Sequence, residues 1–100
     1  MLINKGYSEG DIIVFKLANG DECVAKFLDE NSDGYTVTKP CTVIPGAKGI
    51  ALVQSLFTGK LDTRIRIKHE HVIMHSPVVA EVEKYYLETT SGIALATGAI

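Results

Sequence analysis

The chain has 100 residues, of which 46% are hydrophobic and 22% charged, and a formal net charge of -2. This length suits one domain, and the apolar content excludes a disordered or low-complexity protein. Because 10 basic residues stand against 12 acidic ones, binding of a polyanion would need a local basic patch.

The two cysteines, Cys23 and Cys41, are too few for a disulfide framework, so we expect two reduced thiols. The N-terminus lacks the basic and then apolar pattern of a signal peptide. No segment approaches the ~20 consecutive apolar residues that span a bilayer. These features predict a soluble cytoplasmic protein.

Most of the chain favours short β-strands. Residues 12–17 are rich in β-branched and aromatic side chains, and Asn19-Gly20 after them is a strong hairpin signal. Residues 29–34 form a polar turn, in which Asn and Asp side chains can bond the backbone and the final glycine can adopt a positive φ. At Pro40 the third strand is expected to bulge, to end or to lie at an edge. The segments that favour strands are residues 12–17, 22–28, 35–38, 42–44, 50–57, 63–68 and 72–74.

The pattern changes at Ser76-Pro77, which is typical of a helix start with a hydroxyl cap and a proline in the first turn. Side chains that could form one packing face then recur at helical spacing: Val78, Val79, Val82, Tyr85, Tyr86 and Thr89. We therefore expect a helix over residues 76–92.

Short, bent strands suit a small barrel, because closure removes exposed sheet edges. We expect a mainly β protein, a strongly bent five-stranded antiparallel barrel over residues 12–75 with the C-terminal helix after it. Residues 1–11 are expected to form an irregular arm. The apolar tail at residues 93–100 is expected either to be disordered or to pack on a neighbouring chain.

Two segments resemble the motifs of the Sm/LSm-like (Hfq-like) family of small barrels. The first runs from the strand that ends in Asn19-Gly20, through an acidic turn, to Thr38. The second, residues 67–74, is similar in order and spacing to a strand end, two polar residues and a short apolar strand. The resemblance implies an SH3-like barrel that forms a homo-oligomeric ring of roughly five to eight subunits, joined edge strand to edge strand. It also implies that single-stranded RNA passes through the pore.

In that family the loops of the two motifs line the pore, and the matching residues here are Asn31, Ser32, Asp33, Lys68 and His69. A basic stripe of Arg64, Arg66 and Lys68 alternates with isoleucines along one strand, with Lys60 nearby. Such a stripe could follow a phosphate backbone, and Arg66 therefore joins the predicted RNA contacts. His69 could stack on a base, and Lys68 could meet a phosphate or a base edge.

The family's Arg-Gly pair stands here as Lys68-His69, which keeps the charge but loses bidentate geometry. A second function therefore stays open, a ring-forming scaffold or protein-interaction module without affinity for RNA. A third is a metal-binding or small-ligand barrel, because His69 and His71 would share a face of a strand, with His75 close by.

We expect no metal or other cofactor, because no Cys-x-x-Cys pair and no helical His-Glu-x-x-His motif is present. No glycine-rich nucleophile turn or phosphate-binding loop is present either, so the expected function is non-catalytic. We expect neither a membrane nor duplex DNA as a partner.

Overall fold

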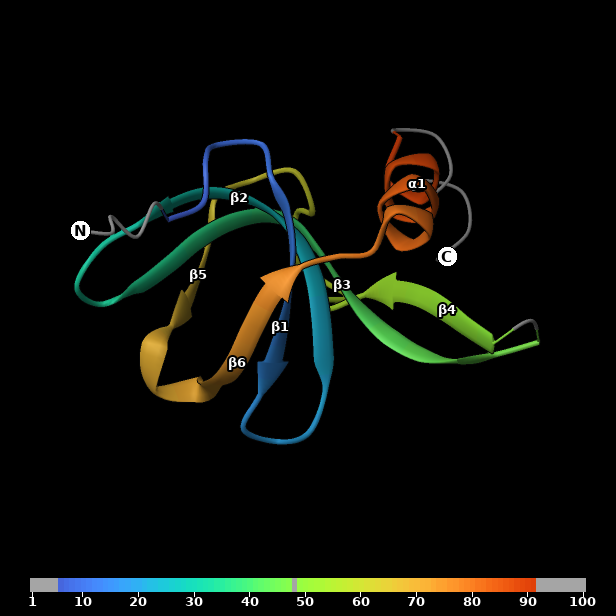
Figure 1. Ribbon diagram of the computed structural model, residues 1–100, viewed down its shortest axis with the longest axis horizontal. Coiled ribbons are helices and arrows are strands. Elements are labelled where there is room, and N and C mark those ends of the chain that lie inside the picture. The colour runs from blue at the N-terminus through green and yellow to red at the C-terminus, as the bar shows by residue number, and fades with distance from the viewer. Residues whose placement is uncertain (1–5, 48, 92–100) are drawn as a thin grey trace.

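The computed structural model describes residues 6–47 and 49–91, and within them the chain forms an antiparallel sheet of six strands and one C-terminal helix (Figure 1). The elements in chain order are β1 (Ile12–Leu17), β2 (Glu22–Glu30), β3 (Gly34–Gly46), β4 (Gly49–Gln54), β5 (Ile65–Lys68), the 3₁₀ turn η1 (His69–His71), β6 (Val72–Pro77) and α1 (Ala80–Thr89). The prediction of a mainly β protein with a C-terminal helix is confirmed. No helix in the described part is long and apolar enough to cross a bilayer.

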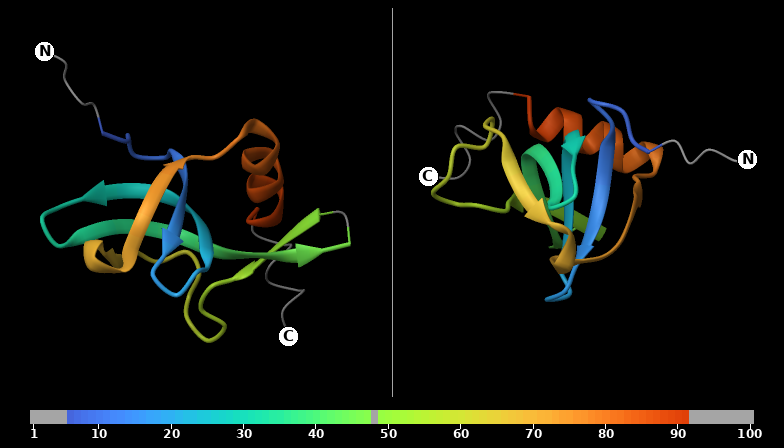
Figure 2. Two further views of the ribbon diagram at one scale, coloured as in Figure 1. Left: turned by 60° about the horizontal axis from the view of Figure 1, so that its bottom comes forward. Right: turned by 90° about the vertical axis from the view of Figure 1, so that its left-hand side faces the viewer.

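The sheet is not closed, so the prediction of a closed five-stranded barrel is wrong. The strand order is β4-β3-β2-β1-β6, and β5 pairs with β3 alone. β3 pairs with two different strands along one of its sides. Its first part, Gly34–Val37, pairs with β5, and its last part, Cys41–Gly46, pairs with β4. Figure 2 shows β5 and β6 diverging on either side of η1. The ladder that would join the two sides of the sheet is therefore missing from the described residues.

β3 continues through Pro40, and the expected bulge is confirmed, because the register of β2 with β3 shifts between Val24 and Lys26. Lys39, the residue before Pro40, has a φ of 52° and turns the direction of the strand. The amide of Lys39 donates a hydrogen bond of 2.8 Å to the carbonyl oxygen of Leu61, in the loop before β5. The predicted interruption is thus a bend inside one strand of 13 residues.

The two predicted turns are confirmed. Gly20 has a φ of 97°, and the side-chain oxygen of Asn19 accepts a hydrogen bond of 2.9 Å from the amide of Asp21. Gly34 closes the second turn without a positive φ, contrary to expectation. It is needed for another reason, since a Cβ at this position would collide with the backbone carbonyl of Ile67 on β5.

Strands β1 and β2 are covered on both faces. Successive side chains of a strand point to opposite sides of the sheet, so each of these strands contributes to two cores. One core lies on the concave side of the sheet and consists of Ile13, Phe15, Ala25, Phe27, Tyr35 and Val37. The other lies beneath α1 and consists of Ile12, Val24, Cys41, Leu52 and Tyr86. The helix therefore explains why both faces of these strands are apolar.

The helix begins later than predicted. Ser76 and Pro77 belong to β6, and the Ser76 hydroxyl donates to the carbonyl oxygen of Pro77 instead of capping a helix. Val79 precedes the first helical residue and provides no side-chain cap. Pro77 is tolerated because β6 lies at an edge of the sheet. The helix also ends at Thr89, three residues before the predicted end at residue 92. The predicted tail and residues 1–5 of the arm lie outside the described residues.

β4 ends at Gln54, three residues earlier than predicted, and β5 begins at Ile65, two residues later than predicted. Gln54 is the register partner of Cys41, directly after the bend in β3, so β4 has no partner strand beyond that point. Leu56 and Phe57 therefore lie exposed in the loop that leads to β5, and the Phe57 side chain is 76% exposed.

Candidate nucleic-acid interface

The turn between β2 and β3 lies directly against the junction of β5 and η1. The amide of His69 donates a hydrogen bond of 3.1 Å to the carbonyl oxygen of Asp33, and Gly34 is the register partner of Lys68. Two segments that are far apart in the sequence therefore share one exposed surface. We call the predicted RNA contacts on these segments the loop cluster: Asn31, Ser32, Asp33, Arg66, Lys68 and His69.

Asn31 shapes the turn through its side chain. Its Oδ1 atom accepts hydrogen bonds from the amides of Asp33, at 2.8 Å, and of Gly34, at 3.1 Å. Its own amide donates to the Gly34 carbonyl oxygen at 2.9 Å. This is the backbone-bonding role predicted for the polar turn. Because Gly34 has no side chain, the turn can then approach the backbone of Ile67 on β5.

The alternation predicted for β5 is confirmed. Ile65 and Ile67 are half-buried against the concave core, while Arg66 and Lys68 are exposed on the other face. The next basic residue toward the N-terminus, Arg64, is also exposed. The basic stripe thus lies on the surface of the sheet, with its apolar neighbours holding β5 in place.

A small cavity of about 230 Å³ opens beside this junction of the turn and β5, and its lining residues are Asp33, Gly34, Arg66, Ile67 and Lys68. Arg66 Nη2 lies 3.5 Å from Asp33 Oδ2, and more than half of each side chain is exposed. Exposed pairs of this kind contribute only about 0–1 kcal/mol, so the guanidinium can exchange its partner. Lys68 has no carboxylate within ion-pair distance among the described residues.

His69 is held on the other side of the loop cluster. Its Nε2 atom lies 3.0 Å from Glu30 Oε2, and its ring meets the edge of Tyr35 with the centroids 4.8 Å apart. Burial raises the pKa of the Tyr35 hydroxyl, and the carboxylate of Glu30 raises it further, so Tyr35 is protonated at neutral pH. Sequence reasoning missed Glu30, because only the tertiary contact between β2 and η1 brings it to His69.

No family model matches the chain, and no curated protein matches it either. Function is therefore inferred from the geometry of the loop cluster, together with the residues of the two sequence motifs.

The rings of His69 and His75 both contact Tyr35, with centroids 4.8 and 5.5 Å from its centroid. Residues 69–71 form the turn η1 and not the continuing strand that would place His69 and His71 on one face. His71 Nε2 lies 3.7 Å from Glu70, and His75 Nδ1 is hydrogen-bonded to the Tyr7 hydroxyl at 2.6 Å. In the part of the chain that the structure describes, no three His, Cys, Asp or Glu side chains are grouped to hold a metal ion.

Cys23 and Cys41 are free and buried. Their register partners are Thr42 and Val24, which places the two thiols on opposite faces of the β2–β3 pair. Burial, together with the neighbouring Cys23, raises the pKa of the Cys41 thiol to about 12. Burial also raises the pKa of Cys23. Both are therefore neutral thiols near pH 7, which makes them weak nucleophiles.

Proposed function

We propose that this chain is an Sm-like module that assembles into a homo-oligomeric ring and binds single-stranded RNA without catalysis. The observation that carries the proposal is the contact of Asp33 with both Arg66 and His69. This contact joins the two motif loops into one exposed surface. A surface that combines cations with a planar imidazole suits single-stranded RNA, which is held by charge and stacking.

The edges of the sheet support self-association. Among the described residues, β4 pairs with β3 alone and β6 pairs with β1 alone, so each strand has one unpaired side. Both edges carry exposed apolar side chains, with Ile50 40% exposed on β4 and Ile73 and Met74 58% and 62% exposed on β6. Pairing of β4 from one copy with β6 from the next would satisfy both edges. Because this contact joins two different surfaces, it can close into a ring.

The charges of the loop cluster support the proposed contact with RNA. Lys68 is exposed at the side of the small cavity, and Arg66 needs only to leave an exposed ion pair to meet a phosphate. His69 has a side chain that is 38% exposed, so one face of its ring can receive a base. A ring would repeat these groups around its axis and so strengthen their field.

A scaffold or protein-interaction module without affinity for RNA is the second candidate. The observation that favours it is the engagement of Arg66 by Asp33 and of His69 by Glu30. Both partners are carboxylates, which repel phosphate. In this function the ring would form through β4 and β6, and the loop cluster would only hold the turn in place.

Two measurements test the proposal. Light scattering should give a mass that is a small multiple of 10.8 kDa. Fluorescence anisotropy should show salt-sensitive binding of uridine- or adenine-rich oligonucleotides, weakened by Lys68→Ala and not by Lys84→Ala on α1. A monomer contradicts the ring. A ring without affinity at low salt selects the scaffold function.

A further inference from the structure

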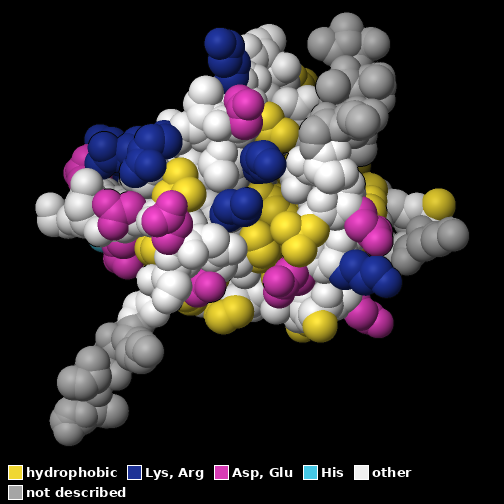
Figure 3. Space-filling model, turned by 90° about the horizontal axis from the view of Figure 1, so that it is seen from above, with side chains coloured by type: hydrophobic (Ala, Val, Ile, Leu, Met, Phe, Trp, Pro, Cys, Tyr) yellow, Lys and Arg dark blue, Asp and Glu magenta, His cyan; other side chains and the backbone are white. Residues whose placement is uncertain are grey.

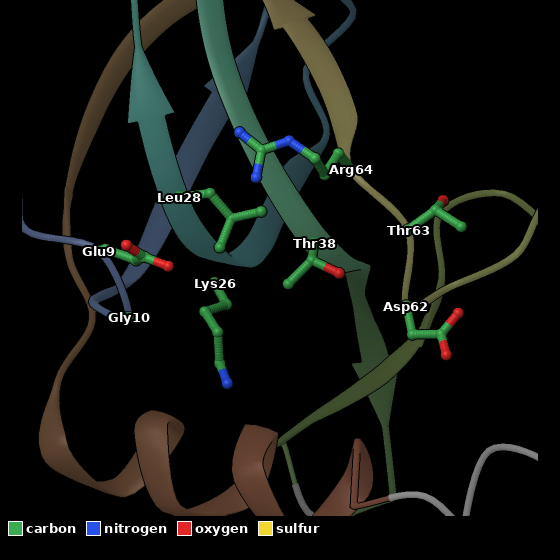
Figure 4. A pocket seen from close by; sticks show the side chains of 8 residues that line it. All are labelled: Glu9, Gly10, Lys26, Leu28, Thr38, Asp62, Thr63 and Arg64. Atoms are coloured by element: carbon green, nitrogen blue, oxygen red, sulfur yellow. The ribbon is translucent and has the colours of Figure 1, made fainter.

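A larger hollow lies where the segment before β1 meets β2, β3 and the loop before β5 (Figure 4). We call it the sheet-face cavity, and its volume is about 580 Å³. No sequence motif pointed to it, because four separate segments form its walls. Its lining residues are Glu9, Gly10, Lys26, Leu28, Thr38, Asp62, Thr63 and Arg64.

The cavity and the basic stripe lie on the same face of the sheet. Lys26 is the register partner of Thr38, and Thr36 is the register partner of Arg66, so these side chains share one face. Arg64 stands two residues before Arg66 and alternates with it in the same way. A step of two residues along a strand is about 6.6 Å, so the cations form a regular row that ends at the cavity.

The two cations of the cavity are available to a ligand. Neither Lys26 nor Arg64 has a carboxylate within 4.0 Å in the described part of the chain, although Glu9 and Asp62 line the same space. Figure 4 shows Arg64 extending across β3 toward Leu28 and Lys26 extending toward α1. The cations therefore stand on two sides of a central wall.

The residues between the two cations and the nearby hydroxyl groups are complementary to a polar ligand that contains a planar ring. Leu28 and Thr38 lie between the two cations and are half-buried. The Thr38 hydroxyl donates to the Leu61 carbonyl oxygen at 3.4 Å, and that of Thr63 donates to the Lys60 carbonyl oxygen at 2.8 Å. Because both hydroxyl protons are used, each oxygen can act toward a ligand only as an acceptor.

A simple anion does not match this set of groups, since Glu9 and Asp62 would repel it. The matching ligand has an anionic group for one of the cations and hydroxyl or amino donors for the carboxylates. The top of the molecule in Figure 1, seen directly in Figure 3, mixes both signs of charge around a hydrophobic centre. A sheet face of this composition suits a ligand that has an anionic group, hydrogen-bond donors and an apolar surface.

We propose that the sheet-face cavity binds one nucleotide, with its phosphate on Arg64 and with Lys26, on the other side of the wall, as a donor to a carbonyl oxygen of the base. The sugar hydroxyls or base amino groups donate to Glu9 and Asp62, and the base lies over Leu28. Arginine can hold a phosphate through two parallel hydrogen bonds. Where the nucleotide is part of a strand that continues along Arg66 and Lys68, the inference rests on the proposed RNA-binding function. If the ligand is a free nucleotide, the inference is independent of that function.

The test is a titration of the full, ¹⁵N-labelled chain with uridine monophosphate, adenosine monophosphate and uridine, followed by NMR. We expect saturable shifts at the amides of Gly10, Thr38 and Arg64 with either monophosphate, and much weaker ones with uridine. Arg64→Ala should weaken the affinity about tenfold, because it removes a charge-assisted hydrogen bond. Arg64→Lys should restore part of it. Lys60→Ala, which changes a nearby cation outside the cavity, should have little effect.

The same shifts with an oligonucleotide would assign the site to a nucleotide within a strand, and shifts with the monophosphates alone would assign it to a free nucleotide. Either result supports the proposal. Absence of shifts at millimolar monophosphate, shifts only at Gly34 and Lys68, or an unchanged affinity in both Arg64→Ala and Lys26→Gln would overturn it. Failure of the loop-cluster function would leave the monophosphate shifts intact, so the two proposals fail separately.

Discussion

The hydroxyl of Tyr86 on α1 donates a hydrogen bond of 2.7 Å to the carbonyl oxygen of Lys39, the residue at which β3 bends. A second, longer contact of 3.3 Å reaches the carbonyl oxygen of Thr38. The helix thus holds the point where β3 passes from one partner strand to the other. Since β5 and the loop cluster depend on the first half of β3, the position of α1 affects the candidate interface.

Replacement of Tyr86 by Phe should destabilise the protein by about 1–2 kcal/mol. The ring still fills its buried place, but the Lys39 carbonyl oxygen loses its stronger donor and keeps only the long contact of 3.8 Å from the Cys41 thiol. Urea denaturation with an unchanged m-value measures the loss. Tyr85→Phe, at an exposed position on the same helix, is the control and should change the free energy of unfolding little. Equal effects of the two changes would remove the proposed role of the Tyr86 hydroxyl.

Lys39→Gly should be neutral or should stabilise the protein by up to about 1 kcal/mol, because a φ of 52° is strained for a residue with a Cβ. Lys39→Ala keeps the strain and removes the charge, so it is the matched control and should be close to neutral. Lys39→Val should be clearly destabilising. The midpoints of urea denaturation rank the three variants. A destabilised glycine variant with a tolerated valine variant would show that the bend carries no strain.

The local features of this fold could be predicted from the sequence. Asn19-Gly20 makes its hairpin, Asn31 bonds its own turn, and the alternation of Ile65 and Arg66 gives the correct faces of β5. Each depends on neighbours within a few residues. The structure also brings the two motif loops of the loop cluster together, while their contact with RNA stays a prediction.

The long-range features could not be predicted from local pattern. Ser76-Pro77 has the signature of a helix start, but pairing of Val14 with Ser76 and Ile13 with Pro77 gives this segment a strand ladder instead. The contact of Glu30 with His69 and the sheet-face cavity likewise depend on how distant segments meet. Closure of the sheet was wrongly expected for the same reason, since it requires pairing that no single strand specifies.

Gly34→Ala should move the two segments of the loop cluster apart and should lower the free energy of unfolding by more than about 2 kcal/mol. The added Cβ would meet the backbone of Ile67 and Lys68, which cannot yield without moving β5 away from β3. Hydrogen exchange should show loss of protection in β5 before the rest of the sheet. Gly6→Ala is the control, because nothing lies within 4 Å of a Cβ there. A fully protected β5 in Gly34→Ala would contradict the close approach.

Met74→Glu should reduce assembly if β6 is the edge that joins a neighbouring copy. The Met74 side chain is 62% exposed on an edge strand, so the charge has little cost in a single copy and a large one in an apolar interface. Light scattering over a range of protein concentrations gives the mass. Met74→Leu keeps the apolar character and should assemble as the original does. Unchanged assembly of the glutamate variant would exclude this part of β6 from the interface.

Stability should fall at alkaline pH through Cys41. Burial raises the pKa of its thiol to about 12 in the folded chain, from an ordinary value near 9.0. Above pH 9 the unfolded chain loses this proton and the folded chain keeps it, so the unfolded state is favoured as pH rises. The contribution is complete below pH 9 and is lost toward pH 12, with a slope of at most about 1.4 kcal/mol per pH unit.

Urea denaturation under reducing conditions at about pH 7, 9 and 10.5 should show this loss. Cys41→Ala should be less stable at neutral pH because it leaves a small cavity, yet it should show a smaller slope with pH. An identical slope in the original chain and in Cys41→Ala would mean that other groups cause the alkaline loss.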